Sequence, residues 1–134
     1  MLSIIFQLSE RLKYVHILNK DAIKIIKEFD NPNILFVCDS PYPCTESYYL
    51  HDFSGRHHEL AATLKNIKGK FIYCCRVTCP KSCQKKSTCS IKMAGRIKKL
   101  YRSNRNYYID VLLNNGQKER IITNFKFDNS KQYK

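Results

Sequence analysis

Four consecutive residues, Asp39-Ser40-Pro41-Tyr42, follow an apolar run at positions 34–38 that has the composition of a buried strand. A strand that ends this way places a carboxylate, exposed carbonyls and an aromatic ring at the carboxyl edge of its sheet, where open α/β sheets bind ligands. The carboxylate and a backbone carbonyl can accept the two hydrogens of an exocyclic amine, and the ring can stack on a base. The tetrad therefore predicts a site for a planar base with an amino group.

The length of 134 residues predicts one small domain, spanning 1–134, with room for a hydrophobic core. Hydrophobic residues make up 43% of the chain, which favours a folded protein over a disordered one. Lysine and arginine total 24 against 11 acidic residues, and the resulting charge of +13 favours a polyanionic partner. Nucleic acid is the polyanion that we expect, although a solvated lysine-rich surface has the same composition.

The sequence also carries signals about compartment. No apolar run approaches the length that spans a membrane, so we expect no membrane partner. The first residues lack a basic start, and their apolar stretch is too short for a signal peptide. Seven cysteines, an odd number without an export signal, favour reduced thiols and a cytoplasmic location.

The first part of the chain alternates between helical and strand-like patterns. Residues 9–14 read as part of a helix with Ser9 as a candidate N-cap, and residues 15–19 read as a short strand. Asp21 then caps a second helix. The apolar face predicted for that helix consists of Ala22, Ile25, Ile26 and Phe29.

The alternation continues after the tetrad. The expected elements are a helix that opens at Ser54 and ends at Gly69, a strand at 70–75, a basic helix around 91–101, and strands at 107–113 and 119–127. The last two strands flank an Asn-Asn-Gly turn, which is a strong hairpin signal. The order predicts an α/β fold: a mainly parallel sheet with helices on its faces and a C-terminal antiparallel β-hairpin.

The tetrad, the closing hairpin and the positive charge occur together in one known family. The stretch from Arg11 to Lys70 resembles the Dam-like DNA adenine N6-methyltransferases in the spacing of its acidic tetrad, tyrosine pair, His-bearing helix and Gly-Lys turn. Residues 119–127 are similar to that family's final strand, whereas residues 76–95 match poorly. The resemblance implies a partial Rossmann-like methyltransferase sheet, S-adenosylmethionine as cofactor, double-stranded DNA as substrate, and no metal.

The resemblance also implies roles for individual residues. Asp39 would accept a hydrogen bond from the amino group of a flipped adenine, the carbonyl of residue 40 would take the other hydrogen, and Tyr42 would stack on the base. Ser40 replaces the proline that is usual in the family's Asp-Pro-Pro-Tyr motif, so the fixed φ angle of proline is lost there. Pro41 matches. Asp21 corresponds to a position near the cofactor's adenine ring, or it serves only as a helix cap.

Several family elements are absent from this sequence. The family's Phe-x-Gly-x-Gly turn, which cradles S-adenosylmethionine, would need closely spaced glycines, and the four glycines here are far apart. An acidic residue after a second strand is also missing. The chain thus resembles the carboxyl-terminal part of a methyltransferase that needs a complementing N-terminal half and lacks activity alone. Without the two missing inner strands, strand 34–38 would expose an unpaired apolar edge.

Other side chains suggest further chemistry. Tyr48 and Tyr49 could line the base pocket or cover the sheet edge, and His57 and His58 fall in the first turn of a helix, where packing explains them. A zinc knuckle is an alternative for the cysteine-rich segment, but its spacing fits poorly and free thiols are expected. The cysteines concerned are Cys74, Cys75, Cys79, Cys83 and Cys89.

The densest basic stretch follows the cysteines and offers phosphate contacts for an enzyme that flips a base out of a duplex. Its members are Lys85, Lys86, Lys92, Arg96, Lys98, Lys99, Arg102 and Arg105. The sequence therefore predicts a DNA adenine methyltransferase that is truncated or split. The alternative is a small basic nucleic-acid-binding protein, with or without a bound zinc ion, that catalyses nothing.

Overall fold

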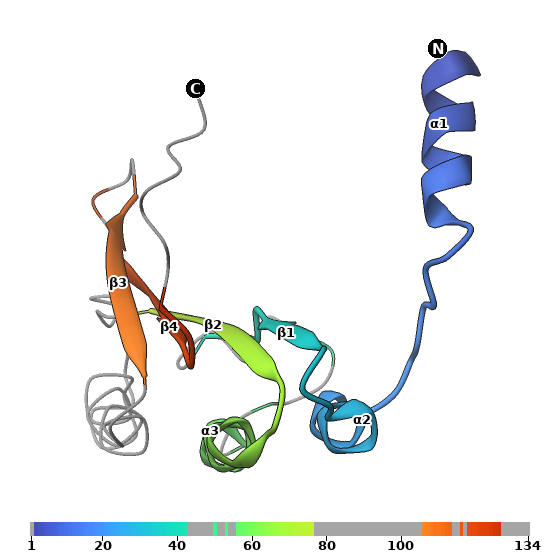
Figure 1. Ribbon diagram of the computed structural model, residues 1–134. Coiled ribbons are helices and arrows are strands. Elements are labelled where there is room, and N and C mark those ends of the chain that lie inside the picture. Colours follow the sequence, from blue (N-terminus) through green and yellow to red (C-terminus); the bar gives the residue numbers. More distant parts are fainter. Residues whose placement is uncertain are drawn as a thin grey trace.

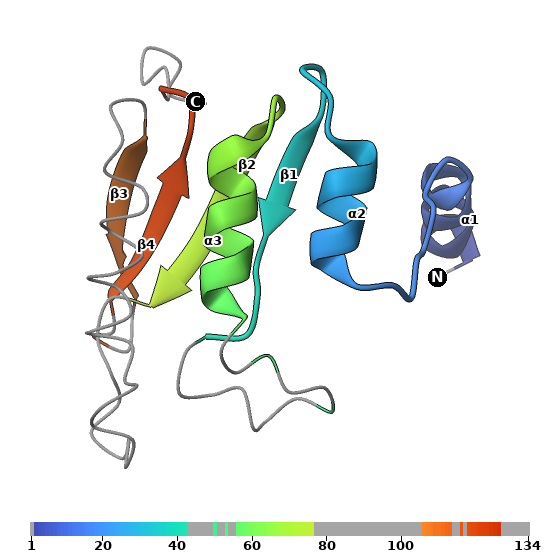
Figure 2. The same cartoon turned by 90° about the horizontal axis from the view of Figure 1, so that it is seen from below.

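The computed structural model describes residues 2–42, 50, 53, 56–76, 106–113, 116 and 118–126. Its elements are, in chain order, α1 (Leu2–Leu12), α2 (Ala22–Phe29), β1 (Leu35–Cys38), α3 (His57–Asn66), β2 (Lys70–Arg76), β3 (Tyr107–Leu112) and β4 (Lys118–Thr123). The strands form one sheet in the order β1-β2-β4-β3, and α2 and α3 lie on the same side of it (Figures 1 and 2). The fold is therefore α/β with a mixed sheet.

The sheet contains the expected C-terminal hairpin, but it is mixed rather than mainly parallel by its pairings. β1 and β2 pair in parallel, whereas β4 runs antiparallel to both of its neighbours, β2 and β3. β4 lies between β2 and β3, so the second strand of the hairpin joins it to the rest of the sheet. Gly116 in the connection has a φ of 76°, which is the left-handed conformation that such a turn favours.

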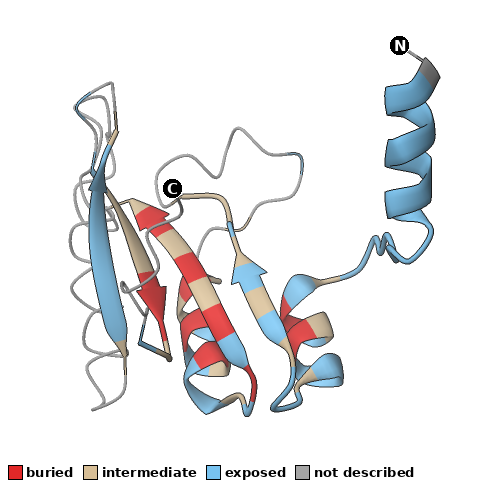
Figure 3. Ribbon diagram, turned by 45° about the horizontal axis from the view of Figure 1, so that its top comes forward, coloured by how far each residue is buried: buried red, intermediate tan, exposed pale blue. Residues whose placement is uncertain are grey.

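The core forms where β2 meets the two helices. Phe71, Tyr73 and Cys75 alternate along β2 and are buried, because successive strand residues point to opposite faces and this set points toward α2 and α3. Leu60 and Leu64 of α3 pack against them. Figure 3 shows the alternation as bands along β2. The helix begins at His57, and Ser54, where it was expected to open, lies outside the described residues.

The buried face of α2 differs from the predicted one by a rotation about the helix axis. Ile23 and Ile26 are the buried residues of this helix, whereas Phe29 is 46% exposed and Ala22 is exposed. The helix carries apolar residues around much of its circumference, so periodicity alone could not determine which side meets the core. Packing of α2 against α3 and the sheet made that choice.

The strand predicted at 15–19 does not form. These residues are an extended arm that connects α2 to α1, and α1 stands apart from the sheet in Figure 1. Ser9 lies inside α1 rather than at its N-cap. α1 exposes large apolar side chains, such as Phe6 at 67%, and none of the helices that the structure describes is long and apolar enough to cross a membrane.

A cluster of hydrogen bonds around Gly69 joins the starts of β1 and β2. The Lys68 and Gly69 N–H groups donate to the Asp30 carboxylate at 2.9 and 3.0 Å, and the Lys70 N–H donates to the Ile34 carbonyl at 2.8 Å. The Asn124 amide donates to the Gly69 carbonyl at 2.8 Å. Together these bonds set where the parallel strands begin.

Gly69 was expected to end the preceding helix, and that prediction was wrong. α3 ends at Asn66, and its C-cap is Ile67 in an extended conformation. Glycine is needed at position 69 for a different reason: a Cβ there would lie 2.9 Å from both the Asn31 and the Ile34 carbonyl oxygens. Backbone approaches backbone too closely for any side chain.

We predict that Gly69→Ala lowers the free energy of unfolding by about 1–3 kcal/mol, because its Cβ forces two carbonyls apart in a packed region. Urea unfolding measures the change. Gly116→Asn is the matched control, since no atom lies within 4 Å of a Cβ there and asparagine tolerates the positive φ. Equal stability of the Gly69→Ala and wild-type proteins would contradict the close approach.

Candidate functional site

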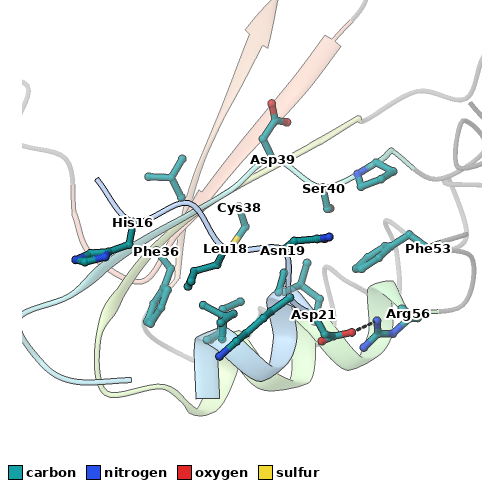
Figure 4. A pocket seen from close by; sticks show the side chains of 17 residues that line it. His16, Leu18, Asn19, Asp21, Phe36, Cys38, Asp39, Ser40, Phe53 and Arg56 are labelled. Carbon is teal, nitrogen blue, oxygen red and sulfur yellow. Dashed lines mark hydrogen bonds and ion pairs between the residues drawn. The ribbon is translucent and has the colours of Figure 1, made fainter. Parts of the chain in front are cut away.

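A cavity of about 920 Å³ lies at the carboxyl end of β1, between that strand, α2, α3 and the arm. Figure 4 shows side chains from all of these segments around it. Its polar lining includes Ser40 on the β1 side and Asn19, Asp21 and Arg56 on the other. Its volume falls in the range of small-molecule sites, which is roughly 300–1,000 Å³. The position agrees with the rule that open α/β sheets bind ligands beyond the carboxyl ends of their strands.

Asp21 lies on the wall of the cavity, and its two carboxylate oxygens make different contacts. One carboxylate oxygen, Oδ1, accepts hydrogen bonds from the Ile23 and Lys24 N–H groups at 3.0 and 3.1 Å, so the predicted helix cap is confirmed. The other oxygen pairs with the Arg56 guanidinium (Figure 4). The Arg56 and helix N-terminal hydrogen bonds lower the pKa of Asp21 to about 2. Arg56, which also pairs with Glu59, was not identified from the sequence.

The tetrad divides between the two sides of the β1 end. Ser40 and Pro41 are half-buried in the cavity, whereas Figure 4 shows the exposed Asp39 side chain projecting to the opposite side of the chain from Ser40. Asp39 and Ser40 thus continue the alternation of the strand, whereas Pro41, which lines the cavity beside Ser40, no longer follows it. Ser40 lies close to the buried Tyr73, and burial raises the pKa of that tyrosine hydroxyl, so the phenol stays neutral.

Tyr42 lies outside the lining of the cavity, on the Asp39 side. The guanidinium of Arg76 sits 5.3 Å from the centre of its ring, in cation–π contact. Burial, a hydrogen bond with Glu119 and the nearby Asp39 charge raise the pKa of the Tyr42 hydroxyl, so the phenol stays neutral. Asp39 and Tyr42 are therefore close enough to interact. Arg76 and Glu119 were not predicted, although each is paired with the other across β2 and β4.

The histidines differ in their environments. His57 is fully buried, and its ring packs edge-to-face on Phe53 with centroids 5.1 Å apart. This supports the packing role that the sequence favoured for it. His58 is half-buried next to it in the first turn of α3. Tyr48 and Tyr49 lie outside the described residues.

The described cysteines are free thiols. Burial raises the pKa of Cys38 to about 11 and that of Cys75 to about 12, so both stay protonated near neutral pH and are poor nucleophiles. Cys74 and Cys75 point to opposite faces of β2, as predicted, and Cys75 is the buried one. Within the part of the chain that the structure describes, no three histidine, cysteine or acidic side chains are grouped to hold a metal ion. Cys79, Cys83 and Cys89 lie outside that part.

The basic residues predicted to contact phosphates all fall outside the described residues. They are Lys85, Lys86, Lys92, Arg96, Lys98, Lys99, Arg102 and Arg105. The helix predicted around 91–101 lies outside as well. Their role stays a prediction from the sequence.

Comparisons with protein-family models, curated proteins and solved structures found no match for this chain.

The residues of the cavity fit S-adenosylmethionine only in part. The volume is sufficient, but both oxygens of Asp21 are already engaged by the helix cap and Arg56. No pair of the four glycines is close enough to form a turn around the ligand. These residues supply one wall of such a site and do not hold the cofactor by themselves.

We predict that Asp21→Asn flattens the dependence of stability on pH in acid. The folded-state pKa of about 2 lies below the ordinary 3.8, so the stabilising contribution of this carboxylate is present above about pH 4 and is lost as the pH falls toward 2. Asparagine keeps the cap but removes the charge. Urea unfolding from pH 5 to pH 2 measures the difference.

The control for this experiment is Glu28→Gln, which removes an exposed carboxylate from the same helix. We expect it to keep the wild-type dependence. Identical slopes for the wild type and Asp21→Asn would show that the Arg56 pair does not stabilise the folded protein.

Proposed function

We propose that this chain is the base-binding part of an S-adenosylmethionine-dependent DNA adenine N6-methyltransferase, and that these residues are inactive without a part that binds the cofactor. The resemblance of residues 11–70 to the Dam-like family supports this assignment. The observation that carries it is the position of the tetrad directly after the carboxyl end of β1. Ser40 and Pro41 line a cavity whose opposite wall bears Asp21, and the Asp39 side chain lies on the other side of the strand end.

The chemistry of the β1 end suits an adenine amino group. Asp39 is exposed, so its carboxylate can accept a hydrogen bond from an incoming amine without any displacement of core residues. The backbone carbonyl of Ser40 accepts the second hydrogen, and accepting both raises electron density on the nitrogen. Tyr42 offers the ring for stacking on the extruded base, where Arg76 already occupies part of its surface.

The cofactor turn and most of the target-recognition region would come from a complementing N-terminal half. S-adenosylmethionine, when bound there, supplies the methyl group. The charge of +13 would attract the DNA backbone, and the predicted basic residues between Lys85 and Arg105 would hold it while the base is flipped. The recognition sequence would be set by the other half.

We predict that Asp39→Ala abolishes methylation in the completed enzyme. The chain is co-expressed with the N-terminal half of a Dam-like enzyme that carries the Phe-x-Gly-x-Gly turn, and methyl transfer from labelled S-adenosylmethionine to duplex DNA is measured. Loss of the acceptor at the reacting amine lowers the rate by about 100-fold or more. The control is Glu28→Ala, which changes an exposed carboxylate on α2 and should methylate normally. Equal rates for Asp39→Ala and the wild type would refute the site.

The charge also supports a second candidate, a nucleic-acid-binding protein without catalysis. Stoichiometric zinc in the purified protein, with a fold that chelators destroy, would favour that candidate. A complementing half that restores methylation would favour the enzyme.

Both proposed functions, the methyltransferase and the non-catalytic nucleic-acid-binding protein, predict that the basic residues between Lys85 and Arg105 bind phosphates. We expect the double variant Lys98→Gln with Lys99→Gln to weaken binding to duplex DNA and to reduce the slope of log affinity against log salt by about 2. Fluorescence anisotropy across a salt series measures both. A matched pair of changes at the exposed Lys24 and Lys27 of α2 is the control, and an equal effect from that pair would refute a specific role for the stretch.

A further inference from the structure

The ring of Tyr42 is in contact with two charged residues that belong to other strands. The guanidinium of Arg76, the last residue of β2, lies 5.3 Å from the centre of the ring. The Tyr42 hydroxyl donates a hydrogen bond to the Glu119 carboxylate of β4. The two contacts act on different parts of the side chain, because the guanidinium covers a face of the ring and the carboxylate holds its far end.

The pairing of the strands brings these residues to one place. The last pair of the parallel register between β1 and β2 is Cys38 with Tyr73, and three residues further on Arg76 is level with the tetrad. Arg76 and Glu119 are partners in the antiparallel pairing of β2 with β4, so their side chains lie on the same face of the sheet. Figure 2 shows the carboxyl ends of β1 and β2 and the start of β4 at one end of the sheet.

The backbone of the tetrad does not fix the ring by itself. Pro41 restricts its own φ angle and favours an extended Ser40, but neither restriction reaches the side chain of Tyr42. A ring with free rotamers loses that freedom when a ligand stacks on it, and the loss lowers the affinity. Contacts with Arg76 and Glu119 order the ring before a ligand arrives.

The charges next to the ring favour a ligand that donates hydrogen bonds. The titratable groups near the hydroxyl of this ring are Glu119, Asp39 and Cys74. Burial raises the pKa of the thiol, so only the two carboxylates are charged. Arg76 balances one of them. Among the residues that the structure describes here, the remaining negative charge attracts an amino group and repels a phosphate.

We propose that Arg76 and Glu119 are positioning residues that hold the Tyr42 ring in place, so that a base stacks on the face opposite the guanidinium. Arg76 stays on the ring when the base binds, and the guanidinium, the ring and the base form one stack. The ligand in this proposal rests on the proposed function, whereas the ordering of the ring rests on its contacts with β2 and β4.

Fluorine NMR of the full chain labelled with 3-fluorotyrosine tests the ordering of the ring without a ligand. The Tyr42 signal is the one that Tyr42→Phe removes. We expect its transverse relaxation rate to fall by about a third in Arg76→Met and in Glu119→Leu, as when an ordered group becomes flexible. The control is Lys118→Gln, a change at the exposed residue before Glu119, which should leave the rate unchanged.

Fluorescence of 2-aminopurine tests what the ordered ring does. The probe is a single-stranded trinucleotide with this adenine analogue at its centre, because stacking on an aromatic ring quenches it. Tyr42→Ala shows how much of the quenching belongs to the ring. We expect Arg76→Met and Glu119→Leu to weaken the quenched complex by about threefold to tenfold. Arg76→Lys keeps a cation and should retain most of the affinity.

Lys118→Gln is the control in this experiment too, since it removes one positive charge, as Arg76→Met does. The sign of the Arg76→Met effect decides the role of the guanidinium. Tighter binding would show that it competes with the base for the ring, and this result would overturn the proposal. Unchanged affinity, or unaltered ring motion in both variants, would overturn it as well.

The two measurements separate this proposal from the proposed function. If Arg76→Met and Glu119→Leu free the ring but the wild type shows no quenching that depends on Tyr42, the base site is refuted. The role of the two residues in holding the ring would then stand. If the wild type quenches the probe and neither variant changes ring motion or affinity, the positioning role is refuted and the base site stands.

Discussion

The close contact of backbone at Gly69 is the constraint on which the rest of this structure depends. There the end of α2, the start of β1 and the start of β2 meet within hydrogen-bonding distance through Asp30 and the Ile34 carbonyl. The contact starts the parallel pairing at Leu35 and Lys70 and carries it to Cys38 and Tyr73. Each residue of β1 is thereby paired with one residue of β2, and this register fixes where the tetrad lies relative to the core. A side chain at position 69 would shift this register, and with it the position of the candidate site.

The same register explains why the tetrad has two environments. Residues that follow a strand continue its alternation, so Ser40 turns toward Tyr73 and the cavity while Asp39 turns toward the opposite face. On that face Tyr42 is held by Arg76 and Glu119, which belong to paired positions of β2 and β4. The antiparallel strand β4 thus contributes to a site that the sequence assigned to β1 alone. A base that stacks on Tyr42 must share the ring with Arg76 or replace it.

Incomplete burial is a feature that β1 and the arm of residues 15–19 share. β1 has an interior strand's sequence at an exposed edge, the arm has a strand's composition without pairing, and the cavity between them has one polar end. A single cause accounts for all three: apolar groups that need a neighbour have none within this part of the chain.

Local rules in the sequence determined the elements whose signals are strong over a few residues. The Asp21 cap, the strand at Leu35–Cys38 and the hairpin around Gly116 were predictable, because each depends on neighbouring residues only. The expectation that this strand would be buried was wrong, because Leu35 and Val37 are exposed. Tertiary structure decided what depends on distant partners. The rotation of α2, the failure of residues 15–19 to form a strand, and the placement of β4 between β2 and β3 follow from which surfaces could be buried together. Arg56 and Arg76 belong to the candidate site for the same reason: their partners, Asp21 and Tyr42, are far away in sequence and close only after packing.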